Sequence, residues 1–224
     1  MKKNQILLAA ALALLAGAAS ADNQSFYVGV IHIDVNAKMP DLSGPTVPPG
    51  AQLRIGSVDT LGFGYAYRFA PEWSAELALG LPPTHKVYGA GVLKPFGQVA
   101  AVEQSPPSAF INYHFKEIVP RVRPFVGLGL NYTHFSSTAS TPSGNAASGG
   151  PTTIKLSDSW GLTWHGGATI SLDQHWHLAA TVASADVRSL QTATTTYPAA
   201  PSTTASTVIT FRPMAYTLAL GYSF

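Results

Sequence analysis

The last twelve residues of the chain alternate between large apolar and small side chains, in the order Pro213-Met214-Ala215-Tyr216-Thr217-Leu218-Ala219-Leu220-Gly221-Tyr222-Ser223-Phe224. A period of two predicts a β-strand with two unlike faces. The small-residue face carries no charge, and the strand ends on an aromatic residue. This combination is typical of a transmembrane β-barrel, although a terminal strand of a soluble sandwich shares the alternation.

The first 21 residues have the features of a secretory signal peptide. Lys2 and Lys3 precede an apolar run over residues 6–18, and Ala19-Ser20-Ala21 supplies a small-x-small cleavage site. The apolar run is too short for a transmembrane helix, which needs about 20 residues. We therefore expect residues 1–21 to be cleaved and residues 22–224 to form a single β-barrel domain.

The composition favours a membrane barrel over a soluble domain. Charged residues make up 11% of the chain, well below the roughly 25% of soluble domains. Without Lys2 and Lys3, the thirteen basic residues fall to eleven, against eleven acidic ones, so no basic surface predicts a nucleic-acid partner. The chain has no cysteine and hence no disulfide or thiolate metal site. The chain has few charges, yet it contains no apolar run of 18 residues outside the predicted signal peptide. A transmembrane barrel explains both observations, because its strands are apolar on alternate residues only.

Seven further segments alternate in the same way as the last one, and they cover residues 25–34, 60–69, 73–81, 99–115, 123–135, 159–172 and 176–183. The facing of residues 25–34 stays ambiguous, and Pro106 and Pro107 interrupt the fourth segment. Short connections near residues 71, 118 and 174 alternate with long ones over 35–56, 82–98, 136–156 and 189–206, all of which we expect to be loops. The pattern predicts an all-β fold, an eight-stranded antiparallel up-and-down transmembrane β-barrel.

The same pattern predicts the orientation of the barrel in a bacterial outer membrane. Short turns are periplasmic and long loops extracellular, so an even number of strands places both termini in the periplasm. Aromatic residues gather at the short-turn ends, as an interfacial girdle in contact with outer-membrane lipid would require: Tyr67, Phe69, Trp73, Tyr113, Phe115, Trp176, Tyr222 and Phe224.

Five stretches of the chain resemble the OmpW family of small outer-membrane proteins. They are residues 81–86 (LPPTHK), Pro106-Pro107, residues 123–133 (RPFVGLGLNYT), residues 158–161 (DSWG) and the terminal residues 221–224 (GYSF). The resemblance implies a barrel with a narrow hydrophobic lumen that passes small hydrophobic molecules. It also implies insertion by the barrel-assembly machinery, with Tyr222 and Phe224 as the assembly signal.

The chain departs from the family pattern at the expected lumen constriction. Aligned on Glu76 and Trp176, the bulky apolar residues of the family fall at Ala78 and Ala183, which are small. The resemblance therefore implies a lumen that is less tightly gated at this level or is closed by other residues.

Other candidates for the lumen or its entrance follow from strand facing and from the matched segments. Arg68 and Glu76 fall on small-residue faces, where we expect them to pair inside the lumen. We also expect Asn131 and His165 to face the lumen. His85, with Pro82 and Pro83, either shapes the extracellular entrance or is a solvated loop residue.

No motif predicts catalysis, a metal or another cofactor. His114, His134, His165 and His177 are not grouped with a nucleophile, as acyl or phosphoryl hydrolysis would need. His175 and His177 could share a strand face but lack further ligands, which favours polar residues at a turn.

Two classes of function stay open at this point. One is a channel or uptake port for small hydrophobic molecules, with bound lipid or detergent as other possible occupants. The other is a structural, stress-related or surface-recognition barrel with a plugged lumen, because eight strands usually enclose only enough space for side chains.

Overall fold

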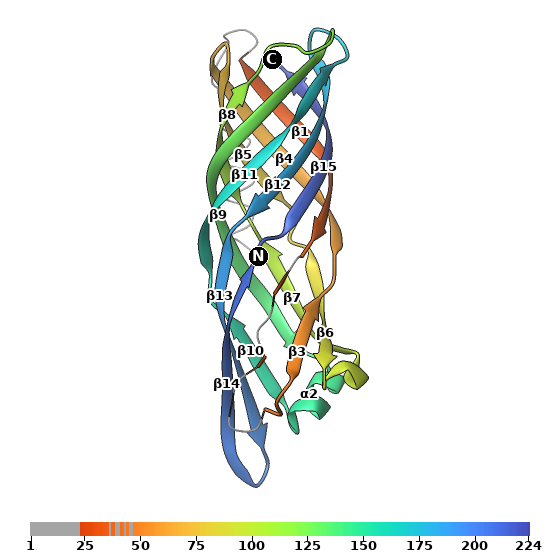
Figure 1. The fold of residues 1–224 in the computed structure, drawn as a ribbon, viewed down its shortest axis with the longest axis vertical. Coiled ribbons are helices and arrows are strands. Elements are labelled where there is room, and N and C mark those ends of the chain that lie inside the picture. Colours follow the sequence, from red (N-terminus) through yellow and green to blue (C-terminus); the bar gives the residue numbers. More distant parts are fainter. Residues whose placement is uncertain (1–22, 36, 39–40, 43, 45–46) are drawn as a thin grey trace, which may run out of the picture.

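The computed structural model describes residues 23–35, 37–38, 41–42, 44 and 47–224, and over these the chain is an elongated β-barrel (Figure 1). The predicted signal peptide lies outside the described residues. Among the described helices, none is long and apolar enough to cross a membrane.

Eight strands close the barrel. They are β1 (Gln24–Asp34), β4 (Val58–Ala70), β5 (Trp73–Gly80), β8 (Ser108–His114), β9 (Val122–Ser140), β11 (Ser159–Ser171), β12 (Trp176–Ala185) and β15 (Met214–Ser223). Their order is β11-β12-β15-β1-β4-β5-β8-β9, every pair is antiparallel, and β9 pairs with β11 to complete the ring. The predicted fold class is confirmed.

The last strand closes the barrel by pairing with the first strand. β15 pairs with β12 on one side and with β1 on the other, from Ser25↔Ser223 to Asp34↔Met214. The backbones of Gln24 and Phe224 exchange two hydrogen bonds, of 2.9 and 3.3 Å. The ambiguous facing of the first strand is settled here, because Phe26, Val28 and Val30 are exposed on the outside and Ile33 is buried inside.

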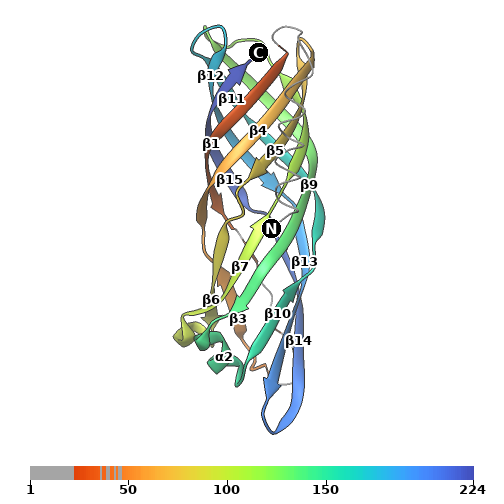
Figure 2. The same cartoon turned by 180° about the vertical axis from the view of Figure 1, so that it is seen from behind.

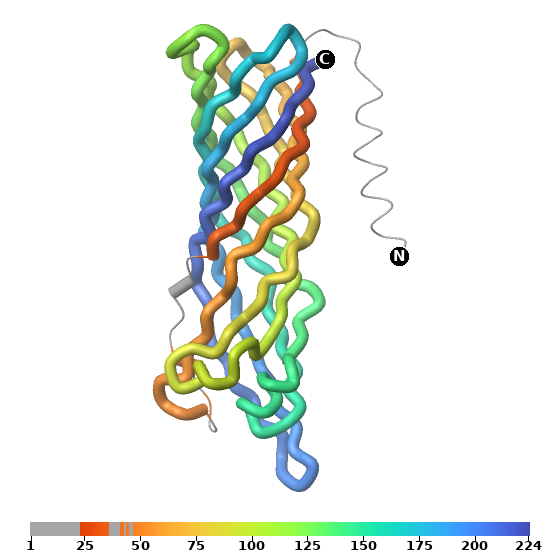
Figure 3. The backbone as a smooth tube through the Cα atoms, turned by 90° about the vertical axis from the view of Figure 1, so that its right-hand side faces the viewer, coloured from red at the N-terminus to blue at the C-terminus, as the bar shows by residue number. Residues whose placement is uncertain are grey.

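The outside of the closed barrel is apolar and its inside is polar or small. Leu128 and Leu162 on the outer face are 73% and 70% exposed, whereas Asn112 and Thr133 on the inner face are 1% and 0% exposed. Such an inverted surface is stable only when lipid replaces water around it. The short turns lie together with the end of β15 at one end of the barrel (Figure 3), the periplasmic end in an outer-membrane barrel.

At the opposite end, further strands extend the wall beyond the membrane-spanning part (Figure 2). They are β2 (Ala37–Lys38), β3 (Ala51–Ile55), β6 (Thr84–Gly91), β7 (Gln98–Ser105), β10 (Thr152–Leu156), β13 (Val187–Tyr197) and β14 (Ala200–Phe211). The short 3-10 helix η2 (Lys94–Phe96) and the helix α2 (Pro142–Ser148) pack beside them.

The sequence prediction of long loops is wrong for most of this region. β6 and β3 pair within the segments expected to be loops, α2 and β10 form within residues 136–156, and β13 and β14 make a hairpin over residues 189–206. Thr, Ser, Ala and Gly dominate residues 136–156 and 189–206, so the hydrophobic alternation is weak there, and prolines and glycines interrupt residues 35–56 and 82–98. Main-chain pairing with a neighbouring strand nevertheless stabilises them, since strand formation depends strongly on context.

The facing of the side chains reverses in this extension. In β6, Thr84 and Lys86 are exposed, whereas His85 and Val87 are buried. In β10, Thr153 and Lys155 are exposed, whereas Ile154 and Leu156 point inward. The extension is therefore built like a water-soluble barrel, with an apolar interior on top of the membrane barrel.

Candidate functional site

Two chambers lie one above the other in the part of the interior that the structure describes. The inner chamber, about 190 Å³, lies in the membrane-spanning barrel, and the outer chamber, about 110 Å³, lies in the extension. Gln104 at the end of β7 lines both.

Apolar side chains separate the two chambers. Ile33 and Val187 line the inner chamber, Val35, Ile209 and Phe211 line the outer one, and all five belong to one buried cluster. The described interior is thus mostly apolar from the outer chamber through this cluster into the upper part of the inner chamber, with Gln104 and Thr133 among the polar exceptions.

A polar floor closes the inner chamber toward the periplasm. The amide nitrogen of Asn112 donates to Oε2 of Glu76 at 2.7 Å, and the Oδ1 of Asn112 accepts from Nε2 of His165 at 2.7 Å. His165 is stacked on Phe110, with ring centroids 3.8 Å apart. One chain of contacts thus crosses the lumen from β5 through β8 to β11.

A second buried pair completes the floor. Nε2 of His114 and Oγ of Ser74 are 2.9 Å apart, and the ring of His114 lies 5.7 Å from the ring of Phe125. The alternation of Phe110, Asn112 and His114 on one strand face was visible in the sequence. Their contacts with residues on β5, β9 and β11 were not, because they depend on barrel closure.

The structure places most of the predicted lumen residues in the linings of the two chambers. Glu76, Ala78, Asn131, His165 and Ala183 line the inner chamber, and His85 lines the outer one. Arg68 is not among the lining residues of either chamber. The small side chains at Ala78 and Ala183 therefore face chamber space, at the level where the family resemblance implied a bulky constriction.

The predicted pairing of Arg68 with Glu76 is wrong. The two belong to paired strands, but Arg68 is opposite Ser74 and Glu76 is opposite Ala66, two positions along. Among the described residues, Arg68 forms no ion pair, and the carboxylate of Glu76 is held by Asn112 instead.

Asn131 contacts the main chain at the break between β7 and β8. Its amide nitrogen lies 3.4 Å from the carbonyl oxygens of both Pro106 and Pro107, and 2.9 Å from Oγ of Ser108. The prolines interrupt the ladder, as the sequence indicated, and Asn131 binds main-chain carbonyl groups at the gap. Pro83 and Pro106 line the inner chamber at this gap.

The other histidines do not form a reactive group. His175 is stacked outside against Tyr222 at 5.5 Å, and His177 packs inside against Tyr27 at 4.9 Å. The two therefore do not share a face, contrary to the possibility that the sequence left open. Within the described part of the chain, no cluster of His, Cys, Asp or Glu could hold a metal ion.

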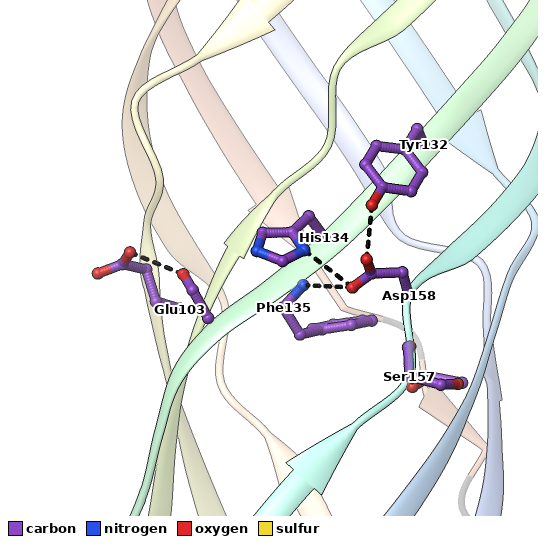
Figure 4. A network of polar contacts seen from close by, with 8 residues as sticks. Glu103, Tyr132, His134, Phe135, Ser157 and Asp158 are labelled. Carbon is purple, nitrogen blue, oxygen red and sulfur yellow. Dashed lines mark hydrogen bonds and ion pairs between the residues drawn. The ribbon is translucent and has the colours of Figure 1, made fainter. Parts of the chain in front are cut away.

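His134 belongs to a network on the outer wall (Figure 4). Asp158 accepts from the hydroxyl of Tyr132 at 2.5 Å, lies 2.9 Å from Nδ1 of His134, and accepts from the backbone N–H of Phe135 at 3.4 Å. The hydrogen bond from Tyr132, followed by that from His134, lowers the pKa of Asp158. The network ties the start of β11 to β9 just above the lipid-facing Trp160.

Tyr222 and Phe224 lie at the periplasmic rim. Tyr222 contacts Trp176 with ring centroids 4.9 Å apart and Phe224 at 6.4 Å. This placement agrees with the predicted girdle. Their role in assembly stays a prediction.

The chain is similar to outer-membrane proteins over nearly its whole length. It is 31% identical to outer membrane protein W of Vibrio cholerae over 217 residues, which cover 95% of this chain and 97% of that protein. It is 29% identical to the dibenzothiophene metabolism operon protein PahQ of Pseudomonas aeruginosa, over 89% of this chain and 88% of that one.

A solved structure shares the fold. The crystal structure of the outer membrane protein OprG from Pseudomonas aeruginosa matches with a TM-score of 0.78 and 25% identity, covering 91% of this chain and 96% of that one. The model of the OmpW family matches residues 24–224. With its closed eight-stranded barrel, apolar outer face and this match, the chain is a member of the OmpW family of outer-membrane proteins.

Proposed function

We propose that this barrel is a narrow channel or uptake port through which small hydrophobic molecules enter the outer membrane. The observation that carries the proposal is the pair of chambers that share Gln104 in their linings, with a cluster of buried apolar side chains between them. An apolar solute would move along this interior without losing contact with apolar surface, whereas a charged solute would have to shed its hydration.

The polar floor would obstruct the exit of an apolar solute toward the periplasm. Glu76, Asn112 and His165 line the periplasmic part of the inner chamber with hydrogen-bonded groups, which an apolar molecule would have to separate. The gap at Pro106 and Pro107 lies in the wall of the same chamber; the prolines have no N–H to donate to a neighbouring strand, although Pro107 accepts from the backbone N–H of Tyr132. A sideways exit through this gap into the bilayer would avoid the floor.

The name of one relative supports the proposal. PahQ is described as a protein of a dibenzothiophene metabolism operon, and dibenzothiophene is a flat aromatic compound without a charge. A family member tied to such a compound is consistent with a port for small hydrophobic solutes.

The alternative is a structural or surface-recognition barrel without transport. A completely filled lumen would favour it, as is usual with eight strands. The floor is filled in this way, but the 190 Å³ inner chamber above it is not, and this favours the port.

Transport by the purified protein tests the proposal. The protein is reconstituted into vesicles with lipopolysaccharide in the outer leaflet, and the entry of apolar and of charged solutes of similar size is measured. We expect faster entry of apolar solutes than in empty vesicles and no gain for charged ones. No selective gain over empty vesicles would refute the port and leave the structural alternative.

A further inference from the structure

The outer chamber contains a single titratable side chain among its described lining residues, His85 on β6. Its neighbours in the lining are mostly apolar and include Leu53, Val87, Val102 and Phe135. His85 itself is 3% exposed. An imidazole at this place is not solvated, contrary to one of the two possibilities that the sequence left open.

The hydrogen bond of His85 shows which ring nitrogen is a donor and which is an acceptor. Nδ1 lies 3.3 Å from the backbone carbonyl oxygen of Gly56. Since a carbonyl oxygen only accepts, Nδ1 carries the proton and donates it. Burial lowers the pKa of His85, against a smaller opposite effect of the Gly56 hydrogen bond. The ring is therefore neutral at neutral pH, and Nε2 has a free lone pair.

Nε2 of His85 is buried and has no hydrogen-bond partner among the described residues. A buried acceptor that is left without a hydrogen-bond donor costs free energy. A small molecule with a hydrogen-bond donor, bound in the chamber that His85 lines together with apolar side chains, would supply this bond.

We propose that the outer chamber binds small apolar molecules that carry one hydroxyl donor, such as phenols, and that this hydroxyl donates to Nε2 of His85. The inference rests on the proposed uptake function and names the substrate class of its first binding site. The volume of about 110 Å³ is of the order of the roughly 150 Å³ cavity that holds one benzene molecule. An ether of similar shape would fit the same space but leave Nε2 unpaired.

Nitrogen NMR of the histidine rings tests the contact directly. The full-length protein in lipid bilayers, with ¹⁵N-labelled histidine, is titrated with phenol and, separately, with anisole, which has the same ring and oxygen but no O–H. We expect phenol to shift one unprotonated ring nitrogen in a saturable way, and this resonance to be missing in His85→Phe. An unshifted His85 resonance, or an equal shift with anisole, would overturn the inference.

Transport selectivity gives a second measurement. We expect wild-type protein to pass phenol about fivefold faster than anisole, the selectivity that one net hydrogen bond supplies. In His85→Phe the ratio should fall to about one, while His85→Gln, which keeps an acceptor oxygen, should retain part of it. Lys86→Phe, the same change at the exposed neighbouring position, is the matched control and should leave the ratio unchanged.

The two proposals fail in different ways. If neither compound enters faster than in empty vesicles, the uptake function fails, while the NMR titration still decides whether His85 binds phenol. If both enter but the ratio is the same in wild type and His85→Phe, only the inference about His85 fails. Heat-dependent gel mobility verifies that each variant is folded, and if His85→Phe does not fold, His85→Leu, which also lacks an acceptor, replaces it.

Discussion

At the scale of single residues, the polar floor depends on a glycine, Gly127 of β9. A Cβ added at Gly127 of β9 would collide with Oδ1 of Asn112 and with Nε2 of His165. These are the two atoms that form the hydrogen bond across the lumen. Gly127 thus provides the space in which Asn112 and His165 meet.

We expect Gly127→Ala to destabilise the barrel by about 1–3 kcal/mol, the usual effect of inserting a methyl group into a filled interior. Urea unfolding in lipid vesicles measures the change. Gly166→Ala is the matched control, because a Cβ there would meet its nearest atoms at 3.6 and 3.7 Å, in ordinary contact. Equal stability of the two variants would contradict the role assigned to Gly127.

At the scale of secondary-structure elements, β9 joins the membrane barrel to the extension. It spans Val122–Ser140 and pairs with β8 and β11 near the periplasm and with β7 farther out. The sequence predicted its first part, where Val126, Leu128 and Leu130 alternate with small residues. The rest was missed because Ser, Thr and Ala lack a clear apolar period, and the Asp158 network secures β9 at that transition.

We expect Asp158→Asn to lower the melting temperature at neutral pH, because the carboxylate loses charge-assisted hydrogen bonds. The pKa of Asp158 is lowered in the folded protein from its ordinary value of 3.8. The stabilisation is therefore fully present above about pH 3.8 and is lost as the pH falls through the lower folded value. Melting curves from pH 7 down to pH 3 should show wild type and variant converging.

Tyr132→Phe separates the contribution of the Tyr132 hydroxyl to the pKa of Asp158 from that of His134. The Tyr132 hydroxyl is the largest cause of the pKa shift of Asp158, so its removal should weaken the pH dependence in the acid range. A constant difference between wild type and Asp158→Asn at all pH values would show that the carboxylate charge is not what stabilises this junction.

At the scale of the whole molecule, the reversal of facing creates the two chambers. In the membrane the apolar side chains point outward to lipid, and in the extension they point inward, away from water. Small lumen residues such as Ala78 and Ala183 then leave the inner chamber unfilled below the apolar cluster. The path for a solute is a consequence of stacking two barrels with opposite polarity.

We expect Ala183→Trp to abolish most of the transport of apolar solutes, because an indole ring would fill much of the inner chamber. Ala180→Trp, three positions earlier on the exposed face of β12, should leave transport unchanged and serves as the control. The measurement is solute entry into vesicles at equal amounts of folded protein. Unchanged entry in Ala183→Trp would place the path outside this chamber.

The sequence by itself determined the membrane barrel. Alternation with period two is a local property of each strand, and the lipid side must be apolar, so eight strands, their order and most inward-facing residues could be predicted. Glu76, Asn131 and His165 were placed in the lumen for this reason, whereas Ala78 and Ala183 were singled out through the family resemblance.

Only the tertiary structure decided the extension and the partners within the lumen. Segments rich in Ser, Thr and Gly become strands through pairing with distant neighbours, which no local pattern reveals. The same holds for the floor, where Glu76 binds Asn112 rather than Arg68. The burial of His85 also depends on this pairing, since the walls around it come from segments that are distant in the chain.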